Sequence, residues 1–545
     1  MTRTTPRPLR PSRRLARSTA VLAALALLTT LAACGGDPDP DSSESAGVDL
    51  SNLKEGYLPG SVPDPDAEPV AGGSVKWAAF AEPASLDPKV TIAALTTGGV
   101  EMLNIYDTLL RYDTETQDFA PQLAEGIESD DNRTWTLTLR DDVTFSDGTP
   151  LDAAAVQASQ ERYADGGPES ALWNANVRSV ETPDDQTVVY TLEKPWAQFP
   201  GMLTTGPGMI VAASAGDGES FEPVGAGPFT LEEWRPQESI RLAANADYWA
   251  GKPALDSLEV VFLPSPDAAM DSFDSDSVDM IFVREPDQVQ EMLAGRPHGY
   301  VNFTAVQNSA LINASKGRPG ADVRVRQALQ LAIDPQVVTE RAFGVAEGGS
   351  STVFPEYSRW HGDASGLPYD PERAKQLLEE ARADGFDGRI RYEDMSDPGS
   401  RATALALKAL WESVGFEVET HLFRSVADMI TAVAVERDYD VVAWGHSFRE
   451  ADPLPKMYAL LHSGGSQTYD AHTSPEMDAL LDEFQVAPDF DAQHAVMQEI
   501  QEQIDEEVPF LALGPYAELL VWHDELNGVV GTANSMVSFA GAWKD

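Results

Sequence analysis

The stretch PQLAEGIESDDNRTWTLTLRDDVTFSDGTPLDAAAV, residues 121–156, predicts two strands followed by a helix. Apolar and polar residues alternate in RTWTLTLR (133–140), the pattern of a strand with one buried face. Residues 143–145 form a second candidate strand, which runs into a Ser-Asp-Gly turn at 146–148. Asp152 stands where a residue would cap the helix that follows. This order favours an α/β chain.

Elements on both sides of that stretch repeat the mixture of strands and helices. TVVYTLEKP (187–195) alternates again and stops at a proline. DVRVRQALQLAID (322–334) spaces its apolar residues at i, i+3, i+4 and i+7 after Asp322, a suitable N-cap. YDPERAKQLLEEARADG (369–385) has Asp370 as its cap, a proline in the first turn and a glycine to end the helix. Strands and helices are therefore interspersed, which is typical of an α/β fold.

The only cysteine of the 545 residues, Cys34, stands in LAACGG (31–36). A single cysteine excludes an internal disulfide and a cysteine-rich metal site. Residues 1–17 contain six arginines and no acid, and residues 18–33 are uncharged. That uncharged run is short for a membrane span, and the whole pattern fits a secretory signal peptide over residues 1–33. Ser12-Arg13-Arg14 leaves twin-arginine export open beside ordinary secretion.

The chain is strongly acidic, with a formal net charge of −50. Removing residues 1–33 takes away six arginines and no acid, which brings the charge to −56. Nucleic acids require a basic surface, so nucleic acid is excluded as a partner. Residues 34–72 are rich in Pro, Asp, Ser and Gly with few large apolar residues, which predicts a flexible tether.

Several further segments, taken in order, resemble one protein family. After PASLDP (83–88) and NIYDTLLRYD (104–113) comes the stretch at 121–156, which carries the most specific match. VGAGPFTLEEWRPQESIRLAANADYW (224–249) follows, then the two helical segments above, and the C-terminal residues 474–513. Together they resemble the family 5 extracellular solute-binding proteins of ABC importers, the group that includes dipeptide, oligopeptide and nickel binders.

The resemblance implies a two-lobed periplasmic-binding-protein-like fold of type II. Lobe I would span residues 73–302, with an extra subdomain inserted at about 100–220, and lobe II would span 303–514. Residues 515–545 would return to lobe I. Ligand would bind between the lobes, which close around it because it contacts both only when they meet.

The resemblance also implies where the protein works. Leu31-Ala32-Ala33-Cys34 resembles a lipobox, so Cys34 would carry lipid and hold a monomeric receptor at the outer face of the cytoplasmic membrane, at the cell surface or in the periplasm. Its partners would be a small solute, such as a peptide or another organic molecule, and an ABC permease with its ATPase. No cofactor and no resident metal are expected.

The same resemblance suggests where cargo touches the protein. The expected contacts lie after the first strand, at the crossing between lobes, and in the loop AWGHSFREADP (443–453), and aromatic side chains suit such clefts. The predicted ligand-binding residues are Phe80, Glu82, Asn313, Trp360, Trp444, His446, Arg449 and Asp452.

Arg449 suggests the kind of cargo. Peptide binders of the family have an Asp in this loop, which pairs with the peptide's amino group, and counting back from Asp452-Pro453 puts Arg449 there. A guanidinium only donates hydrogen bonds, so an anionic or hydroxyl-rich cargo would suit it better than a free amine. In the alternative, a shifted loop lets Glu450 or Asp452 meet the amine while Arg449 faces solvent.

Two other functions remain as alternatives. His446, His462 and His472 could converge on nickel or a metal chelate, although no His pair has i, i+4 spacing. A secreted hydrolase would be the alternative from another class, because GHSFR (445–449) begins like a nucleophile elbow around Ser447. It ends in arginine where the sharp turn needs a small residue, so we expect no enzyme.

Overall fold

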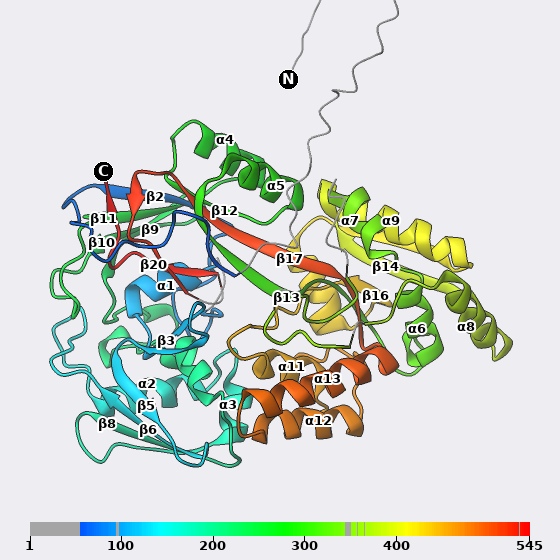
Figure 1. The fold of residues 1–545 in the computed structure, drawn as a ribbon, viewed down its shortest axis with the longest axis horizontal. Helices are drawn as coiled ribbons and strands as arrows, with labels where there is room; N and C mark the ends of the chain where they lie inside the picture. Colours follow the sequence, from blue (N-terminus) through cyan, green and yellow to red (C-terminus); the bar gives the residue numbers. More distant parts are fainter. Residues whose placement is uncertain (1–54, 94–96, 344–349, 357, 365, 533–534) are drawn as a thin grey trace, which may run out of the picture. The chain divides into compact units, whose positions relative to one another are not determined.

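The computed structural model describes residues 55–93, 97–343, 350–356, 358–364, 366–532 and 535–545. The predicted signal peptide, Cys34 and most of the predicted tether therefore lie outside the described residues. The described residues form one compact unit. Its strands and helices are interspersed along the chain, which confirms the α/β class (Figure 1).

One large mixed sheet runs through this unit, with strand order β15-β14-β16-β13-β17-β12-β2-β11-β10-β9 and β1 paired to β13. Its strands are β1 (Gly56–Tyr57), β2 (Ser74–Ala79), β9 (Phe229–Arg235), β10 (Ser239–Ala244), β11 (Ser257–Phe262), β12 (Met280–Val283), β13 (His298–Ile312), β14 (Arg389–Met395), β15 (Glu417–Phe423), β16 (Val441–Ala443) and β17 (Phe510–Trp522).

The long antiparallel strands β13 and β17 join the two ends of this sheet (Figure 1). On one side of them lies the first half-sheet, β12-β2-β11-β10-β9, in which β2 is parallel to both of its neighbours. On the other side lies the second half-sheet, β16-β14-β15, whose strands are parallel. The lobe crossings expected at 302/303 and 514/515 fall inside these two strands.

A separate antiparallel sheet of four strands, β5-β6-β8-β7, lies in the segment where an inserted subdomain is expected. Its strands are β5 (Ala124–Glu128), β6 (Thr134–Leu139), β7 (Val177–Glu181) and β8 (Thr187–Leu192). The remaining short strands are β3 (Leu110–Asp113), β4 (Asp118–Pro121), β18 (Leu526–Asn527), β19 (Val530–Thr532), β20 (Met536–Ser538) and β21 (Trp543–Lys544).

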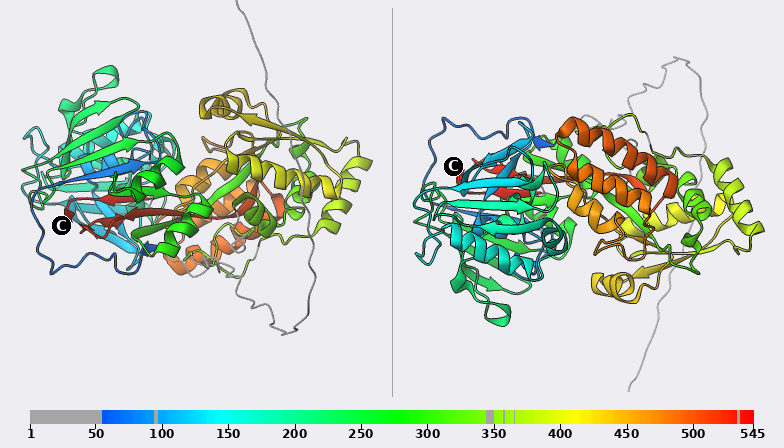
Figure 2. Two further views of the ribbon diagram at one scale, coloured as in Figure 1. Left: turned by 90° about the horizontal axis from the view of Figure 1, so that it is seen from above. Right: turned by 90° about the horizontal axis from the view of Figure 1, so that it is seen from below.

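The helices pack around these sheets, and the two views of Figure 2 show α12 and α13 beside the region of the four-stranded sheet. They are α1 (Gly99–Tyr106), α2 (Ala153–Ala164), α3 (Ser170–Asn176), α4 (Pro266–Asp274), α5 (Pro286–Gly295), α6 (Val323–Leu331), α7 (Pro335–Phe343), α8 (Pro371–Ala383), α9 (Pro398–Val414), α10 (Val426–Ile430), α11 (Leu454–Leu461), α12 (Pro475–Val486) and α13 (Phe490–Glu507). Lys194 pairs with Asp482 at 2.6 Å, and Asn132 donates to the Pro488 carbonyl at 2.9 Å. These contacts tie the four-stranded region to α12 and α13.

The local sequence signals account for most of these elements. RTWTLTLR forms β6, with its alternating apolar side chains buried. Asp152, Asp322 and Asp370 each accept a hydrogen bond from a backbone N–H in the first turn of the helix that they precede. The predicted strand at 143–145 is wrong, because only Thr144 makes an isolated bridge, to Pro150. The turn follows at once, with the Gly148 amide bonded to the Phe145 carbonyl, so the segment is too short to form a ladder.

Residues 55–61 differ from the expected flexible tether. Gly56 and Tyr57 pair with β13, and the Ser61 hydroxyl accepts a hydrogen bond from the Gly299 amide at 2.9 Å. Leu58 is buried beneath them. Backbone pairing and one large apolar side chain outweigh the polar composition of this part of the segment.

Candidate functional site

A cavity of about 460 Å3 lies between the two half-sheets, at the ends of their parallel strands. Arg284 and Glu285 follow β12 of the first half-sheet, whereas Asp397 follows β14 of the second. Trp444 and Gly445 follow β16. Ligands in open α/β sheets bind outside the carboxyl ends of the strands, so the cavity stands where the topology favours a binding site.

The lining residues come from the described parts of both half-sheets and from the strands that join them. They are Arg284, Glu285, Asn308, Ser309, Tyr392, Asp394, Met395, Asp397, Gly399, Ser400, Thr403, Val426, Met429, Ile430, Ala443, Trp444, Gly445 and Leu513.

Asn308 and Ser309 line the cavity from an irregular part of β13. The register with β17 shifts on both sides of Asn308, and Val306 has φ 58°, a left-handed conformation that a β-branched residue rarely adopts. The following loop is held on this irregularity. The Trp444 amide donates to the Ser309 carbonyl at 3.0 Å, and the His446 amide donates to the Val306 carbonyl at 2.9 Å. Trp444 is thereby fixed at the edge of the cavity.

Two carboxylates enter the cavity from the second half-sheet. Asp394 is buried and accepts hydrogen bonds from the Tyr392 hydroxyl at 2.9 Å and from the Met395 amide at 2.7 Å. Burial raises the pKa of Asp394 to about 6, because a charged carboxylate loses hydration there. Asp397 is exposed and caps α9, with its carboxylate accepting from the Ser400 amide at 2.9 Å.

A third carboxylate, that of Glu285, enters from the first half-sheet. Burial raises the pKa of Glu285, its neighbour Arg284 lowers it, and the charge of Asp397 raises it further. The Arg284 guanidinium lies 3.7 Å from Glu285 and 3.9 Å above the ring of Phe80. This side of the cavity therefore combines one cation, one carboxylate and an aromatic face.

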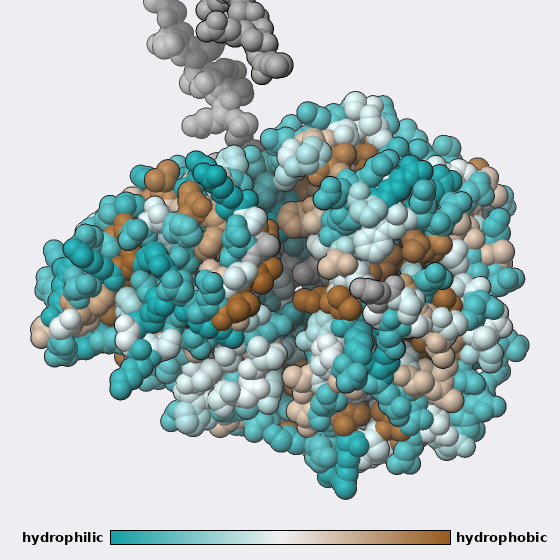
Figure 3. Space-filling view, turned by 180° about the vertical axis from the view of Figure 1, so that it is seen from behind, coloured by the Kyte–Doolittle hydropathy of each residue, from teal (hydrophilic) through white to brown (hydrophobic). Residues whose placement is uncertain are grey.

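The short helix α10 supplies an apolar wall. Val426 and Ile430, one turn apart on α10, remain 56% and 45% exposed. A π-helix, Thr431–Glu436, continues α10, and such turns often occur at functional sites. The space-filling view from behind shows a hollowed face with apolar side chains gathered along its rim (Figure 3).

Of the residues that the sequence suggested as ligand contacts, Trp444 lines this cavity, and Phe80 lies against the lining residue Arg284. Glu82 instead accepts hydrogen bonds from the Trp234 indole and the Gln237 amide. Asn313 is fully buried, and its side-chain amide donates to the Arg437 carbonyl. Both side chains therefore hold neighbouring backbone or side chains and are not among the residues that line the cavity.

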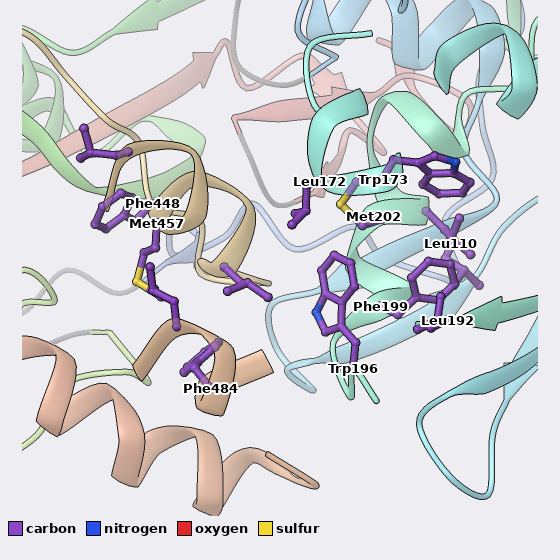
Figure 4. Packing of buried hydrophobic residues seen from close by; sticks show 14 of the residues in the cluster. Leu110, Leu172, Trp173, Leu192, Trp196, Phe199, Met202, Phe448, Met457 and Phe484 are labelled. Carbon is purple, nitrogen blue, oxygen red and sulfur yellow. The ribbon is translucent and has the colours of Figure 1, made fainter. Parts of the chain in front are cut away.

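Trp360 also lies elsewhere, in the apolar core that Figure 4 shows between the four-stranded region and α11 to α12. It is 1% exposed, packs on Phe484 and Phe490, and donates its indole N–H to the Glu450 carbonyl at 2.9 Å. Figure 4 places Trp196 and Phe199 on one side of this core and Phe448 and Met457 on the other. The core joins distant parts of the chain.

Arg449 belongs to this joining region and not to the cavity lining. Its guanidinium lies 2.7 Å from the carboxylate of Glu169, just before α3, with side-chain exposures of 8% and 10%. The expectation of an anionic cargo depended on a guanidinium open to the cavity, and in this structure Glu169 already neutralises it. Glu450, offered as an alternative contact, accepts hydrogen bonds from Ser358 and from the Arg359 amide. We call the Arg449–Glu169 pair the inner ion pair.

Asp452 and His446 are buried near the inner ion pair. Asp452 accepts from the Leu454 amide at 3.0 Å, and burial raises its pKa to about 7. Burial lowers the pKa of His446 to about 3, helped by the charge of Lys456. His446 packs on Phe510, whereas His462 lies near Asp478 and His472 lies near Glu507. The three histidines that were suggested as a nickel site therefore have different neighbours.

Within the described ranges, no group of three or more His, Cys, Asp or Glu side chains is arranged to hold a metal ion. In the same part of the chain, no helix combines the length and the apolar character needed to cross a membrane.

The acidic residues of the cavity, Glu285, Asp394 and Asp397, were not among the ligand contacts predicted from the sequence. Each follows or ends a strand, in VREP (283–286) or in EDMSDP (393–398), where a proline then starts a helix. The rule that ligands bind at the carboxyl ends of parallel strands could have found them, given the sheet order. That order joins segments far apart in the sequence.

Known proteins resemble this chain in sequence and in fold. The family model of the bacterial extracellular solute-binding proteins, family 5 Middle, matches residues 118–468. Heme-binding protein A of Haemophilus influenzae is 26% identical, over 74% of this chain and 79% of its own. The probable D,D-dipeptide-binding periplasmic protein DdpA of Escherichia coli is 24% identical, over 83% of this chain and 90% of its own.

A solved structure shows the same fold. The ABC transporter-associated periplasmic binding protein DppA of Helicobacter pylori, in complex with the peptide STSA, superposes with a TM-score of 0.74. It is 22% identical, over 87% of this chain and 98% of its own. The match of the family model spans more than half of the sequence, so this chain belongs to family 5 of the bacterial extracellular solute-binding proteins.

Proposed function

We propose that this protein is the receptor of an ABC importer and captures a small, peptide-like or other organic solute in the cavity between its half-sheets. The observation that carries the proposal is the origin of the lining, which combines Arg284 and Glu285 after β12 with Asp397 and Trp444 after β14 and β16. A solute there contacts both half-sheets at once. Its binding free energy therefore favours the closed arrangement.

The hinge of this closure lies in β13 and β17. The division into lobes at 73–302 and 303–514, with residues 515–545 returning to the first lobe, puts both crossings in these strands. The irregular backbone around Val306 and Asn308 supports that position, because strained or bulged residues often lie where a chain bends.

The receptor acts outside the cytoplasm, as family 5 proteins do, and delivers its solute to a membrane permease and ATPase. We further propose that residues 1–33 are removed on export and that lipid on Cys34 holds a monomer at the membrane. One acyl chain binds membranes only weakly, so stable anchoring needs more than one. The Pro-, Asp-, Ser- and Gly-rich segment after Cys34 would then serve as the tether.

Solute binding is tested by thermal unfolding with a panel of peptides, oligosaccharides and metal chelates, followed by X-ray scattering with the best ligand. A true ligand at 100 times its dissociation constant should add about 2.7 kcal/mol of stability. The radius of gyration should then decrease. The proposal would be contradicted if no member of the panel binds. It would also be contradicted if the free protein is open and a tightly bound ligand does not reduce its radius of gyration.

Anchoring is tested separately in the bacterial host. The mature protein should partition with membranes and carry lipid at Cys34, and the Cys34→Ala variant should be released in soluble form. A Cys34→Ala variant that stays with the membrane would overturn the anchoring proposal and leave the solute site unaffected.

A further inference from the structure

The charges that line the cavity are unbalanced. Glu285, Asp394 and Asp397 contribute carboxylates from two half-sheets, against the single guanidinium of Arg284 among the lining residues. That guanidinium already lies on the ring of Phe80 and 3.7 Å from Glu285. One more positive charge inside the cavity would therefore be favourable.

Two of the carboxylates reach the cavity from different half-sheets. Glu285 follows β12 and Asp397 follows β14, and the negative charge of Asp397 contributes to the raised pKa of Glu285. Like charges from opposite half-sheets resist closure. A cation between them removes this repulsion and replaces it with attraction, so it couples binding to closure.

The N-terminus of α9 does not offer a competing site for an anion. An uncapped helix start attracts anions through its free amide groups. Here Asp397 caps α9, with its carboxylate accepting the Ser400 amide at 2.9 Å. The cap places a negative charge at the position where an anion would bind.

The cavity also has an apolar side. Val426 and Ile430 of α10 are largely exposed there, and the partly buried ring of Trp444 faces the same space. Covering such side chains stabilises a complex by about 25 cal/mol for each Å2 of apolar surface removed from water. The solute that fits carries an apolar part beside its charge.

We propose that the cargo is an organic cation whose ammonium or guanidinium group binds between Glu285 and Asp397 and whose apolar part packs on α10 and Trp444. This inference deepens the proposed function and depends on it. The cation can come from an amine, from the side chain of a basic residue in a peptide, or from a peptide's amino terminus. The chemistry is the same in each case, and the probes below distinguish the sources.

The test is calorimetric titration of the full-length mature protein with matched probes. Phenylbutylamine, phenylbutanol and phenylbutyrate share one skeleton and differ in charge. Leu-Lys-Leu and Leu-norleucine-Leu, each with a free or an acetylated amino terminus, separate the side-chain ammonium from the terminal one. In at least one matched set the cation should bind about tenfold more tightly than its neutral partner, the effect expected of one charge-assisted contact.

Two variants assign the effect to the proposed residues. Asp397→Asn keeps the cap of α9, since Asn caps as well as Asp, and Glu285→Gln keeps the size of the side chain. Each should lower the affinity for the cation at least fivefold and leave that for the neutral probe unchanged. Glu372→Gln, at an exposed acid in the first turn of α8, is the matched control and should change neither affinity.

Three outcomes would overturn the inference. Equal or tighter binding of neutral or anionic probes, with compaction, would reject the cationic cargo and retain the solute receptor. Unchanged cation affinity in both variants would reject these residues as its site. Failure of every probe to bind, including all three charge classes, would reject the inference together with the binding function of the cavity.

Discussion

The cavity and the inner ion pair both join distant parts of the chain, and they treat charge in opposite ways. Arg449 and Glu169 are almost completely buried and neutralise each other at 2.7 Å. In the cavity, Glu285 and Asp397 carry the same charge and remain accessible. We infer from this difference that the inner ion pair stabilises the fold, and we propose that the carboxylates of the cavity bind a ligand. The variants below test that division.

The largest expected effect comes from breaking the inner ion pair. Arg449→Met leaves the Glu169 carboxylate buried without its partner, which should lower the free energy of unfolding by about 3–5 kcal/mol. Urea denaturation measures the loss. The double variant Arg449→Met/Glu169→Leu should recover most of it, because no unpaired charge remains. An Arg449→Met variant as stable as the original protein would show that the inner ion pair does not stabilise the fold.

A large effect on binding, with less effect on folding, is expected at Trp444. Trp444→Ala removes an aromatic wall of the cavity and should weaken the best solute by about 30-fold to 100-fold, or about 2–3 kcal/mol. Calorimetric titration measures this affinity. Tyr369→Ala, at a 45% exposed aromatic residue outside the lining, is the control. If Trp444→Ala and Tyr369→Ala bind the solute with equal affinity, Trp444 is not part of the binding site.

The pH dependence of stability should identify Asp394. Burial raises its pKa to about 6, so the folded state binds a proton that the unfolded state releases near pH 4. The contribution of Asp394 to the free energy of unfolding is therefore fully present below pH 4. As the pH rises through 6, this contribution falls by about 2 kcal/mol, because the buried carboxyl must then lose its proton. The free energy of unfolding of Asp394→Asn, relative to that of the original protein, should therefore rise by about 2 kcal/mol between pH 4 and pH 7.

Denaturant unfolding at pH 4 and pH 7 measures this difference. Asp489→Asn is the control, because Asp489 is exposed and its replacement can still cap α13. A stability difference for Asp394→Asn that stays constant across this pH range would show that the buried carboxyl does not carry the effect.

The smallest expected effect is a gain in stability at the cavity. Glu285→Gln removes one of the two like charges, which should raise the free energy of unfolding by a few tenths of a kcal/mol, since the group is partly exposed. The same variant should bind the cationic probe less tightly. Opposite signs for stability and affinity are typical of residues kept for function. A lower free energy of unfolding in Glu285→Gln would instead show that Glu285 stabilises the fold.

The sequence could predict what depends on neighbouring residues. The alternation in β6, the N-caps of α2, α6 and α8, and the family all follow from local patterns in order. The cavity depends on the sheet order, which brings residues that follow β12 and residues that follow β14 to one place. No local pattern carries that information.

The loop at 443–453 illustrates the same limit. Counting from Asp452-Pro453 assigned Arg449 to the place of a ligand contact, but the loop is pinned to the irregular part of β13, and Ser447 has φ 54°. The direction of each side chain follows from that local backbone and not from the count. Trp444 stays at the cavity, whereas Arg449 turns towards Glu169.

The most direct test of the cationic cargo is a crystal structure of the mature protein with phenylbutylamine, the cationic probe. Electron density for the ammonium group is expected between Glu285 and Asp397, with the phenyl ring against Trp444 and α10. Density at the inner ion pair, or in the cavity with the ammonium turned away from both carboxylates, would contradict this expectation.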